Sequence, residues 1–567
     1  MRVLPILLIV LLAVFSIGLA LTVMWNSSTG TAAAGVAMPA FLGGKPQGHV
    51  YRSASGEPDD VNPYTSHDPV AQRLILGFTH DALLDRDPDT GELRPALAKE
   101  FEVSADGTTC TFTMRDGLVF ADGSPVTMAD VLFGWELAEA KHLSLGSVAQ
   151  GFQRVSKVDS LDERRFRVHF KDHHFAALPA VGLSWIVAQK QFFVGRVQRA
   201  LAADEEMPAI DSARFATLLH QVNNECGPGT GPYSLLNDPN GVSNWHHQQE
   251  ILLTRNERSW RRKVRPGTWN YAGTRLLFRD SAGQRTALLR GEVDWYFGPQ
   301  LDQLLQSQPK LARDYKKFVF DYPTLGCYRI LWNFTNKPFD DVRVRKAMGM
   351  LVNRAEMTKV FGGNARPAVA HAKFGSRAYP DMQPTAFDPK AARKLLREAG
   401  FDAENDKPLE MTLLIVQGNE QVRRVVELFA GAAKQAGVEL VVHAKPPAGF
   451  AAEKKRNEWH GILQLESFDA LGDPHRFLHS EGLDNDGKWS HPEADRLANA
   501  ARQEFDSVRR ADLWRQLHEL AHREQPAALI VHPLASMLVN KHLEDCNPGP
   551  LGLKPDHAWV APENQKK

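Results

Sequence analysis

The stretch GLVFADGSPVTMADV, residues 117–131, places two carboxylates where chemistry could occur, at Asp122 and Asp130. Such a pair is a candidate metal site or acid–base pair. An EF-hand calcium loop would need alternating oxygen ligands and a terminal glutamate, which are absent here. Asp122-Gly123 is typical of a turn, and Thr127 three residues before Asp130 resembles the capping box that begins a helix. We therefore predict that both aspartates shape the fold and perform no catalysis.

Other chemistry-bearing residue types lack the spacing that their chemistry requires. The glycine-rich GPGTGPY, residues 227–233, has no Lys-Ser/Thr pair of a phosphate loop. No GxSxG nucleophile elbow occurs. The pairs His173-His174 and His246-His247 have no HExxH spacing, so we expect surface histidines. The sequence predicts no catalytic residue, no metal ligand and no cofactor, although a pair of distant carboxylates stays open.

The cysteines are too far apart for a zinc motif. They are Cys110, Cys226, Cys327 and Cys546, without CxxC spacing. In an oxidising compartment they would allow one or two disulfides, whose pairing stays open.

Composition and charge narrow the class of protein. Of the 567 residues, 43% are hydrophobic and 24% are charged, which is globular composition. The length predicts roughly two to four domains. Lysine plus arginine equals aspartate plus glutamate, at 67 each. No net charge therefore favours a nucleic-acid partner, and we expect none.

The N-terminus predicts export. After Arg2, residues 3–25 form an uncharged apolar run, followed by a small, polar, Gly/Ala-rich stretch. We expect residues 1–25 to be a signal peptide or a membrane anchor, because the run is longer than the core of most cleaved signals and close to a bilayer span. Residues 26–49 would be a flexible tether, in which the alanines at 32–34 could mark a cleavage site. The rest of the chain would be periplasmic or extracytoplasmic.

Periodicity predicts a mixed α/β fold. Cys110, Phe112 and Met114 alternate with threonines, which indicates a half-buried strand between Asp-Gly turns. Residues 281–290 read as a helix stopped by Gly291, and residues 339–357 read as one helix. From residue 387 to 444 helices and strands alternate, beginning with a helix capped by Asp388 with proline at its first position; this indicates an α/β layer.

A set of motifs then resembles a known family. The phrases stand in the family's order from about residue 50 to 535: DPDTGELRPALAKEFEVSADGTTCTFTMRDGLVFADGSPVTMADVLFGWE, GTGPYSL, LTRNERSW, ALLRGEVD, WNFTNKPFDDVRVRKAMGMLVNR, YPDMQPTAFDPKAARKLLREAGF and DALGDPHRFLHS. Together they resemble the extracytoplasmic solute-binding proteins of the oligopeptide/dipeptide class (bacterial family 5 type), the capture components of ABC importers.

The resemblance implies an α/β fold with the two-lobed, Venus-flytrap architecture of periplasmic binding proteins. Lobe I would be residues 50–320 plus 531–567, with an extra small subdomain at about 81–205. Lobe II would be residues 321–530. Two strand crossings, at 322–334 and 525–533, would form the hinge on which the lobes close around a ligand.

The resemblance also points to a ligand contact. Family members that bind peptides hold the ligand's ammonium group with an aspartate, and the matching stretch LQLESFDALGDPHRFL makes Asp469 the candidate. The alternative is that Asp469 or Asp473 only caps a turn before Pro474. The stretch departs from the family pattern in having one extra residue before Pro474, and in placing Glu466 where a tryptophan is expected.

These observations favour a binding protein over an enzyme. The chain would capture a peptide or other small solute and deliver it to the permease subunits of an ABC importer, with a possible membrane tether through residues 3–25. One alternative is a ligand-sensing receptor subunit on the same fold. The other is a secreted hydrolase, which rests only on unplaced carboxylates and histidines.

Overall fold

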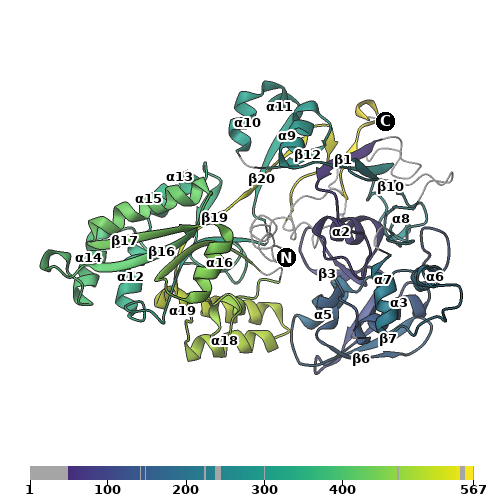
Figure 1. The fold of residues 1–567 in the computed structure, drawn as a ribbon, viewed down its shortest axis with the longest axis horizontal. Helices are drawn as coiled ribbons and strands as arrows, with labels where there is room; N and C mark the ends of the chain where they lie inside the picture. Colours follow the sequence, from purple (N-terminus) through teal and green to yellow (C-terminus); the bar gives the residue numbers. More distant parts are fainter. Residues whose placement is uncertain are drawn as a thin grey trace. The chain divides into compact units, whose positions relative to one another are not determined.

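The computed structural model describes residues 49–565, except 141, 147, 223–224, 237–243, 299, 323, 469–470 and 550–555. The contacts within the chain divide it into two units (Figure 1). One is Val319–Ala535; the described residues before Val319 and from Ser536 onward form the other. The predicted signal or anchor at 1–25 lies outside the described residues, as does the tether up to residue 48. None of the described helices combines the length and apolar character needed to cross a membrane.

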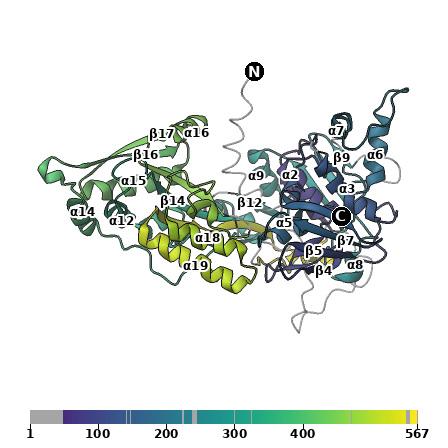
Figure 2. The same cartoon turned by 90° about the horizontal axis from the view of Figure 1, so that it is seen from below.

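The unit Val319–Ala535 is built on one mixed sheet whose two faces are both covered by helices (Figure 2). In spatial order its strands are β15 (Ala365–Pro367), β19 (Ala527–Pro533), β14 (Leu325–Trp332), β18 (Gly461–Ser467), β16 (Leu409–Val416) and β17 (Val438–Lys445). Strand side chains point alternately to the two faces. Ile330 and Trp332 pack on one face, while Cys327 and Leu331 pack on the other.

Two groups of helices cover these faces. The first face carries α12 (Val342–Met350), α13 (Arg354–Val360), α14 (Pro389–Glu398) and α15 (Glu420–Gln435). The second carries α16 (Pro447–Arg456), α17 (His475–Leu478), α18 (Pro492–Gln503) and α19 (Ser507–Glu524). The predicted α/β alternation over 387–444 is confirmed. Asp388 caps α14 by accepting a hydrogen bond from the Ala391 N–H.

The single helix expected at 339–357 is instead two helices. The first, α12, ends at Met350, and α13 begins at Arg354. The side chain of Asn353 accepts a hydrogen bond from the Glu356 N–H. An asparagine at this position starts a new helix because it satisfies an N–H group that has no partner within the helix.

The other unit contains several smaller sheets. One joins β1 (Val50–Ser55), β11 (Gly273–Phe278), β10 (Glu250–Arg255), β8 (Tyr233–Ser234) and β9 (Trp245–His246). A second joins β4 (Ala98–Val103), β5 (Thr109–Met114), β7 (Arg165–Phe170) and β6 (Val155–Ser160). A third places β20 (Ala535–Asn540) between β12 (Trp295–Phe297) and β13 (Tyr315–Phe320). Short pairs join β2 (Leu84–Arg86) to β3 (Leu93–Pro95), and β21 (Leu543–Glu544) to β22 (Trp559–Val560).

This unit also contains helices. They include α2 (Pro69–Leu74), α3 (Met128–Glu139), α5 (Ala177–Ser184), α6 (Lys190–Arg199), α7 (Ala213–His220), α8 (Arg261–Val264), α9 (Ser281–Arg290), α10 (Leu301–Ser307) and α11 (Pro309–Asp314). Two sequence predictions are confirmed here. In β5, Cys110, Phe112 and Met114 are buried. Helix α9 ends at Gly291, which adopts the left-handed conformation with φ of 71°.

The aspartates of residues 117–131 shape the fold as predicted. Asp122 accepts hydrogen bonds from the N–H and the hydroxyl of Ser124, at 2.9 and 2.7 Å. Asp130 lies in the first turn of α3 and accepts from the N–H of Thr127 at 2.8 Å and from the N–H of Lys190 at 2.8 Å. Asp122 thus closes a turn and accepts an exposed hydrogen bond from Gln189 Nε2 at 3.1 Å, and Asp130 joins the start of α3 to the start of α6.

We expect Asp130→Ala to lower the free energy of unfolding by about 1–2 kcal/mol, as loss of a helix cap does. Denaturant unfolding followed by circular dichroism measures this. Asp122→Ala is the matched control, because its hydrogen bonds with Ser124 and Gln189 are exposed to solvent, and its effect should stay within about 0.5 kcal/mol. Equal losses for the two variants would contradict the distinction.

Candidate functional site

The carboxyl edge of the six-stranded sheet is the candidate ligand site of the unit Val319–Ala535. Strands β16, β17 and β18 run parallel, and β14 is antiparallel to both β18 and β19. Four strands therefore end at the edge where β14 begins. The chain also enters the unit near Val319 and leaves it near Ala535 at this edge. Open α/β sheets bind ligands outside the carboxyl ends of their strands.

The stretch that contains Asp469 leaves β18 at this edge. Asp469 and Ala470 lie outside the described residues, so the proposed ammonium contact stays a prediction. The neighbouring Asp473 caps a turn, as the alternative interpretation of this stretch proposed. Its Oδ1 accepts from the His475 N–H at 3.0 Å, and its Oδ2 accepts from Arg502 Nε at 2.7 Å.

Glu466, three residues before Asp469 in the sequence, carries a buried charge. Its side chain is 2% exposed, and Arg329 Nε lies 3.0 Å from Oε2. His371 Nδ1 lies 3.0 Å from the same oxygen. Burial alone would raise the pKa of Glu466, but Arg329 and His371 outweigh it and the pKa is lowered. An ionised glutamate therefore occupies the position where a tryptophan was expected, and β14 and the 371 region supply its partners.

A thiol and two further imidazoles surround this ion pair. Cys327 Sγ lies 3.9 Å from Glu466 Oε2, and burial raises the pKa of the thiol well above its usual value. Burial lowers the pKa of His532 to about 4 and that of His518 to about 3. A protonated thiol beside a carboxylate is a poor nucleophile. The cluster therefore does not have the electrostatics of a cysteine hydrolase.

A small pocket adjoins the cluster. Its lining includes His371, His518, His522 and Arg354. Arg354 donates to the carbonyl oxygens of Leu529 and Thr385, each at 2.8 Å. Burial lowers the pKa of Arg354 to about 10. The guanidinium therefore stays charged near neutral pH, and it joins β19 to the segment before α14.

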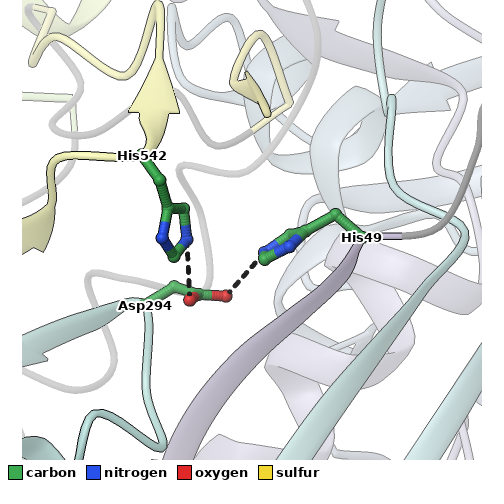
Figure 3. A group of neighbouring side chains, drawn as sticks. All are labelled: His49, Asp294 and His542. Atoms are coloured by element: carbon green, nitrogen blue, oxygen red, sulfur yellow. Dashed lines mark hydrogen bonds and ion pairs between the residues drawn. The ribbon is translucent and has the colours of Figure 1, made fainter. Parts of the chain in front are cut away.

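A second buried cluster, in the other unit, was not anticipated from the sequence. Asp294 lies between α9 and β12, and its two oxygens face His49 and His542, each with Nε2 at 3.1 Å (Figure 3). Arg52 donates to Oδ2 through its N–H at 2.8 Å and to Oδ1 through Nη2 at 2.7 Å. These contacts lower the pKa of Asp294 far below its usual value despite its burial. The cluster joins the segment before β1, the start of β12 and the turn after β20.

The glycine-rich stretch, the cysteines and the His173-His174 pair, which were examined as possible sites of chemistry, have the following surroundings. A Cβ at Gly229 would lie 1.8 Å from the Thr79 carbonyl oxygen, so the glycine-rich stretch packs tightly against that backbone. All four cysteines are free and buried. The expectation of surface histidines is wrong for His174, which is 6% exposed and accepts the Ala176 N–H at Nδ1. In this pair only His173 is exposed.

Comparison with known proteins identifies the family of this chain. The model of the bacterial extracellular solute-binding proteins, family 5 Middle, matches residues 92–488. The chain is 24% identical over 489 residues to the oligopeptide-binding protein OppA of Bacillus subtilis, covering 84% of this chain and 85% of that one. It is 24% identical over 535 residues to the dipeptide-binding protein of Escherichia coli, covering 88% and 92%.

A solved structure agrees with these matches. The oligopeptide-binding protein AppA from Bacillus subtilis, in complex with a nonapeptide, superposes with a TM-score of 0.64 at 20% identity. The match covers 91% of this chain and 100% of that one. The α/β, two-lobed architecture expected from the sequence is thereby confirmed. The chain belongs to the family 5 bacterial extracellular solute-binding proteins.

Proposed function

We propose that this chain captures a peptide or similar solute outside the cytoplasm and delivers it to an ABC-type membrane importer. The observation that carries the proposal is the family match over residues 92–488, together with peptide-binding relatives that align with more than four-fifths of the chain. The site chemistry supports binding rather than turnover. In the described cluster the thiol is protonated, His518 and His532 are neutral, and Glu466 is held by Arg329.

Capture would proceed by closure of two lobes, residues 50–320 plus 531–567 and residues 321–530, on a hinge formed by the crossings at 322–334 and 525–533. Strand-like main-chain hydrogen bonds would hold the peptide and tolerate varied side chains. Ligand contacts made by both lobes favour the closed state. Residues 1–25 would direct export and, if uncleaved, tether the protein to the membrane.

Thermal unfolding of the purified full-length chain tests the proposal. A ligand at a hundredfold its dissociation constant stabilises by about 2.7 kcal/mol. We expect di- to pentapeptides to raise the melting temperature and to remain intact by mass spectrometry. Sugars and amino acids serve as comparison ligands. Peptide hydrolysis would favour the hydrolase, and stabilisation by another class alone would overturn the peptide assignment.

We expect Asp469→Ala to weaken binding of peptides with a free N-terminal amine by roughly tenfold to a hundredfold. This corresponds to loss of a hydrogen bond to a charged group, about 1.5–3 kcal/mol. Isothermal titration of each peptide and its N-acetylated form measures the effect. The acetylated peptide should bind both proteins equally. Asp473→Ala is the matched control, because it should reduce stability without changing the preference for a free amine. Unchanged affinity in Asp469→Ala would remove this residue from the site.

A further inference from the structure

The buried cluster beneath the carboxyl edge brings together three side chains that metals prefer. One ligand atom each of Cys327, His371 and Glu466 lies within 4.8 Å of the other two, and all three side chains are buried. They come from β14, from the segment after β15 and from β18. We propose that Cys327, His371 and Glu466 bind one divalent metal ion of the zinc class. The proposed ligand contact Asp469 is not one of these three residues.

The separations fit a single ion. Zinc bonds to thiolate sulfur at about 2.3 Å and to imidazole nitrogen or carboxylate oxygen at about 2.0–2.2 Å. Ligand atoms around one such ion therefore lie about 3–4 Å apart. His371 Nδ1 is 3.0 Å from Glu466 Oε2, and Cys327 Sγ is 3.9 Å from the same oxygen. A thiolate with an imidazole favours zinc over magnesium or calcium, which prefer oxygen ligands.

The thiol must release its proton for the metal to bind. The ion replaces the proton on Cys327 sulfur, and that proton passes to solvent. Thiolate and carboxylate then supply two negative charges against the two positive charges of the metal. Glu466 also pairs with Arg329, so the cluster with its guanidinium carries one net positive charge when the metal is bound. Arg329 has a further partner in the Asp484 carbonyl oxygen, at 3.2 Å, so the guanidinium keeps an acceptor if Glu466 turns towards a metal.

A second observation points to a missing partner. Both ring nitrogens of His518 and Nε2 of His532 are buried without a hydrogen-bond partner among the described residues. Buried polar atoms in native proteins usually have a partner. His518 and His371 line the same pocket. Water on an open position of the metal would give this pocket a polar occupant.

The cluster of His49, Asp294 and His542 also brings ligand atoms together, but it suits a metal less well. Both oxygens of Asp294 already accept hydrogen bonds from Arg52. A metal there would have to displace a guanidinium and a backbone N–H, without a thiolate to compensate. The Cys327 cluster is therefore the better candidate.

Cobalt titration tests the proposal directly. The full-length protein, stripped with a chelator and kept reduced, is titrated with Co²⁺ and then with Zn²⁺. We expect a thiolate-to-cobalt charge-transfer absorption that saturates at one equivalent, about one proton released per ion, and loss of the band when zinc displaces cobalt. No band in the wild-type protein would overturn the proposal, whatever the variants do.

Matched variants locate the site. Cys327→Ser should abolish the band, and His371→Gln should weaken cobalt binding at least tenfold. Cys226→Ser, which changes another buried cysteine in the other unit, should retain it. A band that survives Cys327→Ser, or one lost in Cys226→Ser, would place the metal elsewhere. Should Cys327→Ser fail to fold, His371→Gln and the wild-type band decide the question. Peptide binding measured in chelator tests the proposed function separately.

Discussion

Asp294→Asn is expected to destabilise its unit by about 3–5 kcal/mol, the usual loss when one partner of a buried ion pair is removed. The Asp294 side chain is fully buried, and Arg52, His49 and His542 all contact it. An asparagine keeps the shape but leaves the Arg52 guanidinium without its counter-charge. It also offers an N–H₂ group where both oxygens accept hydrogen bonds. Denaturant unfolding near neutral pH, with fluorescence and circular dichroism in parallel, measures the loss.

Acidification should reduce this difference. Because the pKa of Asp294 is depressed in the folded state, its contribution is fully present above the unfolded pKa of about 3.9 and is lost as the pH falls towards the folded pKa. Wild type and Asp294→Asn should therefore converge only below about pH 4. Glu420→Gln is the control, since exposed arginines lower the Glu420 pKa to about 2. Its replacement should change stability little, because solvent screens exposed ion pairs. A stability difference between wild type and Asp294→Asn that does not change with pH would contradict the ion-pair explanation.

Local chemistry explains why some structural features could be predicted from the sequence. A cap, a turn and a strand alternation each depend on residues within a few positions. Asp130 facing Thr127 and Gly291 ending α9 follow from such short spacings. The break between α12 and α13 at residues 351–353 was not predicted, because the helical spacing of apolar residues continues through it. Only the side chain of Asn353 marks a new helix start.

The buried clusters could not be predicted in the same way, because their partners are far apart in the chain. His49 and His542 lie 245 and 248 residues from Asp294. Glu466 was noticed as a departure from the family pattern, but Arg329 and His371 lie on separate segments that only the sheet and its covering layer bring together. The sequence pattern shows that Glu466 is unusual, and its contacts with Arg329 and His371 explain why a buried charge is tolerated there.

The resemblance supplied the fold and the solute-binding role, which composition alone did not. Neutral net charge gave no reason to expect a nucleic-acid partner, and missing motifs argued against several classes of enzyme. Neither identified a solute. The ordered phrases identified the family because they combine turn, cap and packing residues over nearly the whole chain. Ligand identity would depend on a few side chains, of which Asp469 is the proposed one, and the general sequence pattern carries little information about them.

The second large effect is expected at Glu466. Glu466→Gln should destabilise the unit Val319–Ala535 by about 3–5 kcal/mol, because it leaves the Arg329 guanidinium, 1% exposed, without its anionic partner. The lowered pKa of Glu466 in the folded state means that this contribution is present above its unfolded pKa and is lost as the pH falls through the folded pKa. Unfolding is measured in chelator, so that metal does not contribute.

A double variant separates a missing counter-charge from lost packing. Replacing both charges with apolar residues of similar size, Arg329→Met with Glu466→Leu, should recover most of the stability, because an uncompensated buried charge costs more than an apolar pair. The double-variant cycle should therefore give a coupling of a few kcal/mol, larger than the 0.5 kcal/mol within which independent sites add. If the losses of the two single variants simply add, the Arg329–Glu466 contact at 3.0 Å contributes no interaction energy. Glu466 would then be important for its volume rather than its charge.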